Sequence, residues 1–189
     1  MIEGKKVILR PFEIEDAAHL HELRKDTKGI KDFVGSPFPS NLESEKEWIS
    51  KMYPKGDRNV ITLAVEQKEN KEFSGYVNVR NINYIHRNAE VGMIISKNFR
   101  GKGLNVDVCF ALYAYLFNEI NLHKVYTTVL VENTTALKSH QKFGFVVEGL
   151  IKEQVYQDGI YKDVHFISLY KPDFYKKYNE YMKLPDDNK

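Results

Sequence analysis

The feature that most constrains this chain is a glycine-rich basic loop at residues 98–105, with the sequence NFRGKGLN. It follows an apolar run at residues 91–95 and precedes a pattern with apolar residues at i, i+3, i+4 and i+7, which is typical of an amphipathic helix. Two closely spaced glycines let backbone N–H groups turn inward, and a helix N-terminus adds orphan N–H donors. With Arg100 and Lys102 adding charge, the loop predicts an anion cradle suited to a pyrophosphate. The alternative is a solvated tight turn with two incidental basic residues.

Charge and cysteine content exclude several classes of protein. The chain has 28 basic and 26 acidic residues and a net charge of +2. It therefore lacks the excess of basic residues that is typical of proteins that bind nucleic acid. The single cysteine, Cys109, excludes an intrachain disulfide framework and a four-cysteine zinc site. The N-terminus lacks the apolar stretch of a signal peptide, and no window approaches about 18 apolar residues. We therefore expect a cytoplasmic protein with no nucleic-acid partner and no membrane contact.

Hydrophobic periodicity and turn signals predict an α/β domain. Helices are expected at about residues 13–25, 44–54, 104–118 and 134–142. Strands are expected at residues 7–10, 59–66, 73–82, 89–96, 125–131, 146–157 and 160–169. The second helix carries a capping-box pattern from Ser44 to Glu47, and Asp158-Gly159 predicts a hairpin between the last two strands.

The links between these elements predict the topology. Short polar links join the strands at 59–66, 73–82 and 89–96 into an antiparallel meander. The helix between the strands at 89–96 and 125–131 implies a right-handed crossover and parallel pairing. We expect residues 1–170 to form a single domain and residues 171–189 to be a C-terminal tail, either a loosely docked helix or a disordered end.

Three further polar side chains are expected near the loop. Glu90 starts the strand that leads into it, Asn133 caps the helix after the next parallel strand, and His140 lies two turns along that helix. In an open α/β sheet, ligands bind beyond the carboxyl ends of parallel strands. A cradle, an amide, an imidazole and a carboxylate are therefore expected to converge in one cleft.

These residues resemble the GCN5-related N-acetyltransferase (GNAT) family. Its phosphate-loop pattern is Gln/Arg-x-x-Gly-x-Gly/Ala, matched here by Arg100-Gly101-Lys102-Gly103-Leu104 and then Asn105, which stands where Gly or Ala is usual. A second family block, Asn-x-x-Ala/Ser-x-x-x-Tyr-x-Lys-x-Gly-Phe, is matched at residues 133–145, with His140 in place of the tyrosine. The resemblance implies a mixed, mostly antiparallel twisted sheet with flanking helices, splayed central parallel strands and a C-terminal β-hairpin.

Within the family, the chain is similar to the spermidine acetyltransferases and the ribosomal-protein N-terminal acetyltransferases. The similarity to the spermidine branch lies in residues 86–90, 94–96, 101–104, 149–150 and 158–161. The spermidine enzymes carry an acidic pair before the second helix, used for polyamine binding. This chain has Gly35-Ser36 there. Polyamines and protein N-terminal amines therefore both remain candidate acceptors, and assembly into a homo-oligomer is a further expectation.

The resemblance also implies how the site works. Acetyl-CoA would place its pyrophosphate on residues 100–105 and its pantetheine arm beside the strand edge at Met93 and Ile94, with Asn133 hydrogen-bonding the cofactor. Glu90 is the candidate base for the acceptor amine, or orients that amine without taking a proton. His140 is the candidate proton donor to the leaving thiolate, as an imidazolium, with water as the alternative.

Other functions stay open at this point. The chain could bind CoA without transferring acetyl groups, or acetylate an aminoglycoside or another small amine. A nucleotide-binding module is the weakest alternative, because the loop lacks the Gly-Lys-Ser/Thr ending of a P-loop. No metal site is expected, because His86 and His165 have no partners at ligand spacing.

Overall fold

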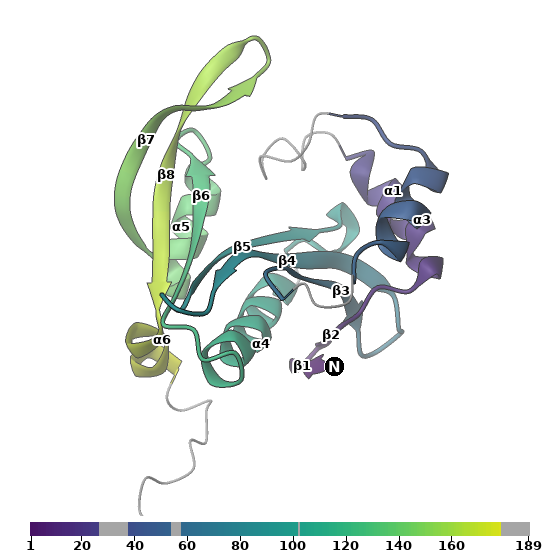
Figure 1. The fold of residues 1–189 in the computed structure, drawn as a ribbon, viewed down its shortest axis with the longest axis horizontal. Helices are drawn as coiled ribbons and strands as arrows, with labels where there is room; N and C mark the ends of the chain where they lie inside the picture. Colours follow the sequence, from purple (N-terminus) through teal and green to yellow (C-terminus); the bar gives the residue numbers. More distant parts are fainter. Residues whose placement is uncertain (27–37, 54–57, 102, 179–189) are drawn as a thin grey trace, which may run out of the picture.

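The structure, a computed structural model, describes residues 1–26, 38–53, 58–101 and 103–178 of the chain. Within them the strands form one eight-stranded sheet in the order β1-β2-β3-β4-β5-β6-β8-β7 (Figure 1). The strands are β1 (Ile2–Glu3), β2 (Val7–Arg10), β3 (Ile61–Gln67), β4 (Phe73–Asn83), β5 (Asn88–Ile95), β6 (Lys124–Leu130), β7 (Val146–Gln157) and β8 (Ile160–Tyr170). The helices are α1 (Ala17–Arg24), α3 (Leu42–Ser50), α4 (Leu104–Asn118), α5 (Thr134–Phe143) and α6 (Lys171–Tyr178).

The two central strands are the only parallel neighbours in this described sheet, and they pair over a short distance. Asn88, Ala89 and Glu90 of β5 face residues 124–126 of β6, and the pairing stops there. All other neighbouring strands are antiparallel. Beyond Glu90, β5 keeps its bonds to β4 but has none to β6. The carboxyl-terminal halves of β5 and β6 therefore splay apart, as the family resemblance implied.

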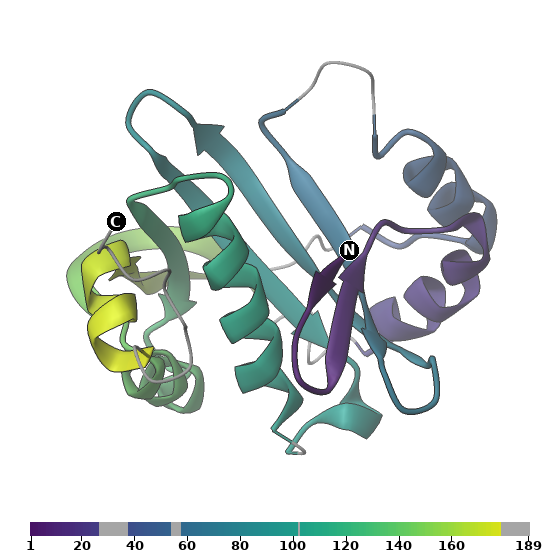
Figure 2. The same cartoon turned by 90° about the horizontal axis from the view of Figure 1, so that it is seen from below.

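Two apolar cores lie on the two faces of the sheet. The larger one packs α4 and α6 against the strands through Leu112, Leu116, Phe117 and Phe174. The smaller one packs α1 and α3 against β3, β4 and β5. Figure 2 shows α4 crossing the sheet, with the β1–β2 hairpin on one side and α6 on the other. The strand β5 contributes to both cores, because its side chains alternate between the two faces.

The predicted elements are present with small shifts at their ends, and α4 has the predicted bounds. The capping box of the second helix was assigned to the wrong residues. Asn41 is the N-cap of α3, and its side chain accepts a hydrogen bond from the Ser44 backbone N–H at 2.8 Å, while Ser44 Oγ takes the reciprocal contact. Ser44 is therefore the third helical residue, because asparagine caps a helix as well as serine does.

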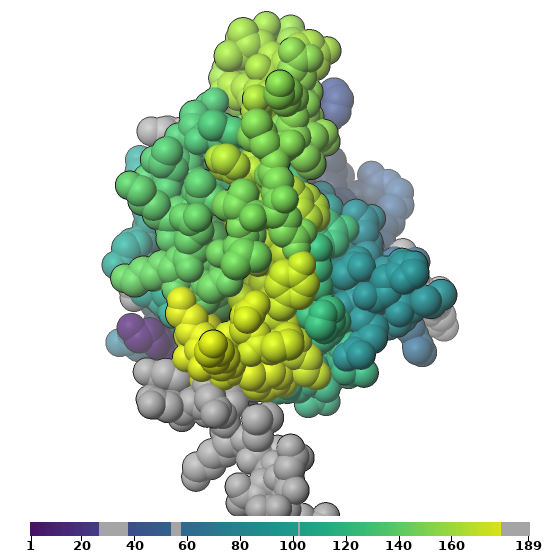
Figure 3. Space-filling view, turned by 90° about the vertical axis from the view of Figure 1, so that its left-hand side faces the viewer, coloured from purple at the N-terminus to yellow at the C-terminus, as the bar shows by residue number. Residues whose placement is uncertain are grey.

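The segment after Tyr170, expected to be a loosely docked helix or a disordered end, is helical over its first eight residues. These residues form α6, and the Phe174 side chain is fully buried against Phe110, Phe117 and Phe143. Figure 3 shows α6, in yellow, packed on the body of the molecule below β7. Helix α6 therefore contributes to the main core. Residues 179–189 lie outside the described part of the chain.

The hairpin formed by β7 and β8 turns at Asp158-Gly159, as predicted. Its outer strand β7 is an edge of the sheet and exposes Val146, Val147 and Leu150. The register between β7 and β8 shifts twice, between Val147 and Gly149 and between Ile151 and Val155. Such shifts mark β-bulges or similar irregularities, which bend a strand and increase its twist.

In the part of the chain that the structure describes, no helix combines the length and the apolar character that crossing a membrane requires.

Replacing Phe174 by alanine tests the role of α6. We expect the free energy of unfolding, measured by urea denaturation, to fall by about 3–5 kcal/mol, because a buried aromatic side chain leaves a cavity. The matched control is Ile85→Ala, at a side chain that is 88% exposed, which should change stability by less than about 0.5 kcal/mol. A loss at Phe174 as small as the control's would show that α6 is not part of the core.

Candidate active site

A cleft of about 850 Å³ opens where β5 and β6 separate. Helix α4 and helix α5, which follow these two strands, provide its other walls. It is lined by Arg80, Glu90–Ile95, Arg100, Asn105, Val106, Val108, Cys109, Leu112, Tyr113, Thr127–Val129, Asn133, Thr135, Ala136, Ser139, His140, Lys142, Phe143, Phe145, Lys177 and Tyr178. The structure therefore brings together the predicted carboxylate, amide and imidazole, the strand edge, and Arg100 and Asn105 at the two ends of the predicted cradle, while Gly101, Gly103 and Leu104 are not among the lining residues.

The glycines of the cradle have the geometry that backbone anion binding needs. Gly101 and Gly103 have φ angles of 77° and 76°, which favour glycine over other residues. No atom lies within 4 Å of a Cβ built on either glycine, so both face open space. Gly103 is the N-cap of α4, and no side chain caps this helix end within the described residues. The first N–H groups of α4 are therefore available to a ligand.

The other residues of the predicted loop differ in their roles. Leu104 is buried in the main core, so only its backbone can face a ligand. Asn105, the departure from the family pattern, lines the cleft. Lys102 lies outside the described residues. The Arg100 guanidinium donates from Nε to the Ile95 carbonyl oxygen at 3.0 Å and pairs with Asp26 at 2.7 Å. It therefore ties the loop to the end of β5 and to the segment after α1.

The edge of β5 at Met93 and Ile94 lines the cleft. Both residues lie beyond the last pair with β6, while β4 pairs with their other side through Val77 and Tyr76. Successive strand residues direct their backbone groups to opposite edges, so Ile94 bonds to β4 while the N–H and C=O of Met93 face the cleft without a strand partner among the described residues. An extended ligand that binds as an added strand needs such free groups.

Asn133 is placed at the start of α5, as predicted. Its side-chain oxygen accepts a hydrogen bond from the Ala136 backbone N–H at 3.1 Å and so caps the helix. Among the described residues its side-chain NH₂ group has no protein partner. Because Asn133 lines the cleft, this NH₂ group is the donor that a cofactor could use.

Glu90 faces the cleft as one half of a cross-strand ion pair. It lies directly opposite Arg80 on β4, and the Arg80 guanidinium contacts its carboxylate at 2.7 Å. A register shift after Arg80 brings Asn81 close, and its amide donates to the other carboxylate oxygen at 3.1 Å. The two contacts hold the carboxylate in a fixed position at the wall of the cleft. The sequence did not predict this pairing, because it depends on the register of β4 and β5.

His140 is held by its own helix. Its Nδ1 lies 2.8 Å from the Ala136 carbonyl oxygen, and because a carbonyl only accepts, we assign the proton to Nδ1. The ring packs edge-on against Phe145 at 5.1 Å. Burial lowers the pKa of His140 below its ordinary value of 6.5, and the hydrogen bond to Ala136 opposes this only in part. The imidazole is therefore neutral near pH 7, with Nε2 unprotonated.

Several residues of the cleft were not among the predicted site residues. Lys177 and Tyr178 of α6 line it, and the Tyr178 hydroxyl donates to the Phe143 carbonyl oxygen at 2.9 Å. The sequence signal for them is the aromatic pair Phe174 and Tyr178, four residues apart on one helix face. Cys109 also lines the cleft, and burial raises the pKa of its thiol to about 11, so it stays protonated near pH 7.

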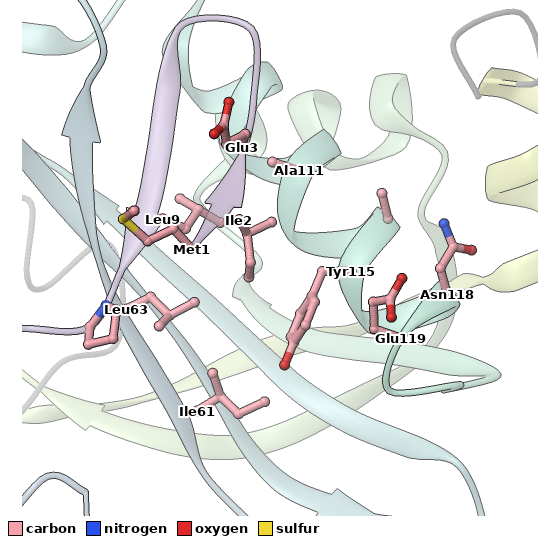
Figure 4. Close-up of a pocket in the computed structure, with 12 residues that line it drawn as sticks. Met1, Ile2, Glu3, Leu9, Ile61, Leu63, Ala111, Tyr115, Asn118 and Glu119 are labelled. Carbon is pink, nitrogen blue, oxygen red and sulfur yellow. The ribbon is translucent and has the colours of Figure 1, made fainter. Parts of the chain in front are cut away.

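A second cavity, of about 560 Å³, lies between α4 and the strands β1, β2 and β3 (Figure 4). Apolar side chains of the strands, including Leu9, Ile61 and Leu63, form one wall, and Tyr115 and Asn118 of α4 and its C-cap residue Glu119 lie opposite. None of the predicted site residues lines this cavity. The chemistry that the sequence predicts therefore belongs to the cleft between β5 and β6.

The described residues contain no group of three or more His, Cys, Asp or Glu side chains that could hold a metal ion.

Comparison with known proteins identifies the family. The family described as Acetyltransferase (GNAT) domain matches residues 6–146. The spermidine N(1)-acetyltransferase of Vibrio cholerae is 32% identical over 161 residues, covering 85% of this chain and 91% of that protein. The putative ribosomal N-acetyltransferase YdaF of Bacillus subtilis is 25% identical, covering 89% of this chain and 93% of that protein.

A solved structure agrees with this assignment. The crystal structure of the V. cholerae spermidine N-acetyltransferase in complex with CoA and spermine matches with a TM-score of 0.80 at 30% identity, covering 90% of this chain and 99% of that one. The chain belongs to the GNAT acetyltransferase family. It is an acetyl-CoA-dependent N-acetyltransferase, and the family and the fold class predicted from the sequence are both confirmed.

Replacing Gly103 by alanine tests the cradle. The methyl group would occupy the open space in front of the α4 N-terminus, so we expect the Kd for CoA, measured by calorimetry, to rise at least about tenfold, or about 1.4 kcal/mol. Gly159→Ala is the matched control, because Gly159 has a similar φ of 82° and an equally open Cβ position, but lies in the hairpin turn. Both variants should lose about 1–2 kcal/mol of stability. Equal CoA affinities in the two variants would contradict the cradle.

Proposed function

We propose that this enzyme transfers the acetyl group of acetyl-CoA to a primary amine of a polyamine or of a protein N-terminus, by direct attack in a ternary complex. The observation that carries the proposal is the cleft between the splayed strands β5 and β6. It joins an uncapped helix N-terminus, an unpaired strand edge, a carboxylate and a neutral imidazole in one cavity.

The cofactor would lie along this cleft. Its pyrophosphate would accept hydrogen bonds from the backbone N–H groups of Gly101 and of residues 103–105, helped by the positive end of the α4 dipole. Its pantetheine arm would pair with the free edge of β5 at Met93 and Ile94. The Asn133 NH₂ group would donate to the same arm, because its side-chain oxygen is already occupied by Ala136.

The acceptor amine must be neutral to attack the thioester, although a lysine-like amine has a pKa of about 10.4. Glu90 would attract the ammonium group and take its proton directly or through water. Arg80 and Asn81 hold the carboxylate in place for this role. The oxyanion formed by the attack would be stabilised by a backbone N–H near Ile94. This step forms the C–N bond and leaves a second proton on the nitrogen.

His140 would handle that second proton. Because the resting imidazole is neutral, its Nε2 can accept a proton, becoming the imidazolium that protonates the leaving thiolate. The C–S bond then breaks, giving the N-acetylated amine and free CoA. We therefore still propose His140 as the proton donor. Its imidazolium form would exist only during the reaction, after Nε2 has taken a proton from the attacking amine.

Two acceptor classes follow from the relatives. The V. cholerae relative is named as a spermidine N(1)-acetyltransferase and YdaF as a putative ribosomal N-acetyltransferase. The residues that distinguish this chain from the spermidine branch, Gly35-Ser36, lie outside the described residues. Polyamines and protein N-terminal amines are therefore the two acceptor classes that we propose.

An acceptor screen tests the proposed function. Release of free thiol from acetyl-CoA would be measured with spermidine, spermine, peptides with a free N-terminus and aminoglycosides. We expect turnover with a polyamine or a peptide amine. Turnover with aminoglycosides alone would show that the proposed acceptors, polyamines and protein N-termini, are wrong. CoA binding without thiol release from any amine would favour a binding protein over an enzyme.

The pH dependence of turnover tests the state of His140. We compare kcat of the wild type with that of His140→Gln from about pH 5.5 to pH 9, across the range where histidine titrates. Above pH 7 the wild type should be faster by about 10²-fold. This advantage should shrink as the pH falls through the lowered pKa of His140, because protonation blocks Nε2.

The opposite trend would contradict this mechanism. If His140 had to enter the reaction as an imidazolium, the advantage of the wild type over His140→Gln would grow as the pH falls. Thermal unfolding of both proteins over the same pH range is the control for stability.

A further inference from the structure

Asp107 lies in the first turn of α4, next to the cradle, but faces away from the cleft. Asn105, Val106 and Cys109 of the same helix line the cleft. The Asp107 carboxylate instead accepts three backbone hydrogen bonds from the turn between β1 and β2. The donors are the N–H groups of Lys5 at 2.8 Å, Lys6 at 2.7 Å and Val7 at 3.1 Å.

The turn between β1 and β2 is shaped to receive this carboxylate. Three successive N–H groups that point to one place form an anion-binding nest. Gly4 precedes them, and a Cβ at Gly4 would lie 2.5 Å from Oδ2 of Asp107 and 2.9 Å from its Cγ. Any side chain at this position would have to push the carboxylate or the turn away. The close approach therefore depends on both Gly4 and Asp107.

The contact joins the edge of the sheet to a helix that is about 100 residues away in sequence. The β1–β2 hairpin lies at one edge of the sheet and contacts α4 along its side (Figure 2). Leu104 fixes the start of α4 from within the core, and Asp107 fixes the same turn from the outside. Between them they set the direction in which the free N–H groups of α4 point.

We propose that Asp107 is a positioning residue for the cofactor. It holds the first turn of α4 against the β1–β2 turn. The backbone N–H groups at the start of α4 therefore stay directed toward the pyrophosphate. The inference rests on the proposed position of the pyrophosphate at the cradle. It makes the N-terminal hairpin, which supplies no residue to the cleft, part of the support of the cofactor site.

The direction in which cofactor affinity changes when the Asp107 carboxylate is removed distinguishes a charge effect from a positioning effect. A carboxylate close to the cradle repels a pyrophosphate, so removing its charge alone would tighten cofactor binding. Losing a support of the α4 turn would weaken binding, because small displacements of binding groups have large effects. The two explanations predict opposite changes in affinity.

The experiment measures the Kd for CoA by calorimetry, and KM for acetyl-CoA and kcat with the best acceptor. For Asp107→Ala we expect Kd and KM to rise by about tenfold or more, with kcat at saturating acetyl-CoA within about twofold of the wild type. Asp107→Glu, which keeps a carboxylate, should recover part of the affinity. Unchanged or tighter binding in Asp107→Ala would overturn the proposal.

Two further variants distinguish the loss of the contact between Asp107 and the β1–β2 turn from the loss of the Asp107 charge and from a general loss of folding. Gly4→Ala keeps the Asp107 charge but displaces the contact, and should weaken CoA binding in the same direction. Glu119→Ala removes an acidic side chain at the other end of α4, beside the second cavity, and should leave Kd unchanged. If Asp107→Ala does not fold, normal CoA affinity in both Gly4→Ala and Asp107→Asn would overturn the proposal.

The Gly103→Ala variant keeps this inference separate from the proposed cradle. If Gly103→Ala leaves CoA binding unchanged, the position of the pyrophosphate is wrong. If Gly103→Ala weakens CoA binding while the Asp107 and Gly4 variants do not, the cradle stands and only the positioning role of Asp107 falls.

Discussion

The pairing between β5 and β6, which ends after three residues, is the constraint on which the site depends. Up to Glu90 the two strands share hydrogen bonds, and beyond it each turns one bare edge toward the gap. Backbone N–H and C=O groups need partners, so this gap suits a ligand that carries amides of its own. Helices α4 and α5 start just after the two strands and point their N-termini toward the same end of the gap. A single interruption of the sheet thus creates the channel and its polar end together.

The strand β5 contributes side chains to both faces of the sheet next to the cleft. Val91 and Ile95 pack into the core beneath α4, while Ile94 packs into the core beneath α1 and α3. Glu90 stands at the point where the paired part of the strand ends. A group bound at this point can reach both sides of the sheet, which is what transfer between two different substrates requires.

Periodicity and turn chemistry were sufficient to predict most of the fold. The bounds of α4 follow from its repeating apolar face, and the hairpin follows from Asp158-Gly159. The cap of α3 was misplaced because two overlapping patterns, starting at Asn41 and at Ser44, both look like helix starts. Helix α6 was underestimated because one buried aromatic residue in a polar segment gives a weak signal. Its burial depends on partners from α4 and α5, which only the tertiary structure brings together.

In the candidate site, too, features set by local sequence could be predicted and features set by tertiary contacts could not. Backbone features, namely the cradle glycines and the strand edge, could be predicted from local sequence because local sequence determines backbone geometry. The ion pair of Glu90 and the neutral form of His140 could not be predicted, because they depend on contacts across strands and on burial. The Arg80 partner of Glu90 is ten residues away in sequence and depends on the register of β4 against β5. The neutral form of His140 depends on how deeply α5 packs beside Phe145.

The register shifts of β7 have a consequence for the behaviour of the protein at high concentration. A long, flat edge strand with exposed apolar side chains is a template on which other chains can add strands and grow into fibrils. In β7 the two register shifts bend the strand, so its outward N–H and C=O groups do not form an even row. An incoming straight strand could match only part of that row. The bend in β7 therefore disfavours edge-to-edge pairing with another chain, even though side chains along this strand are apolar and exposed.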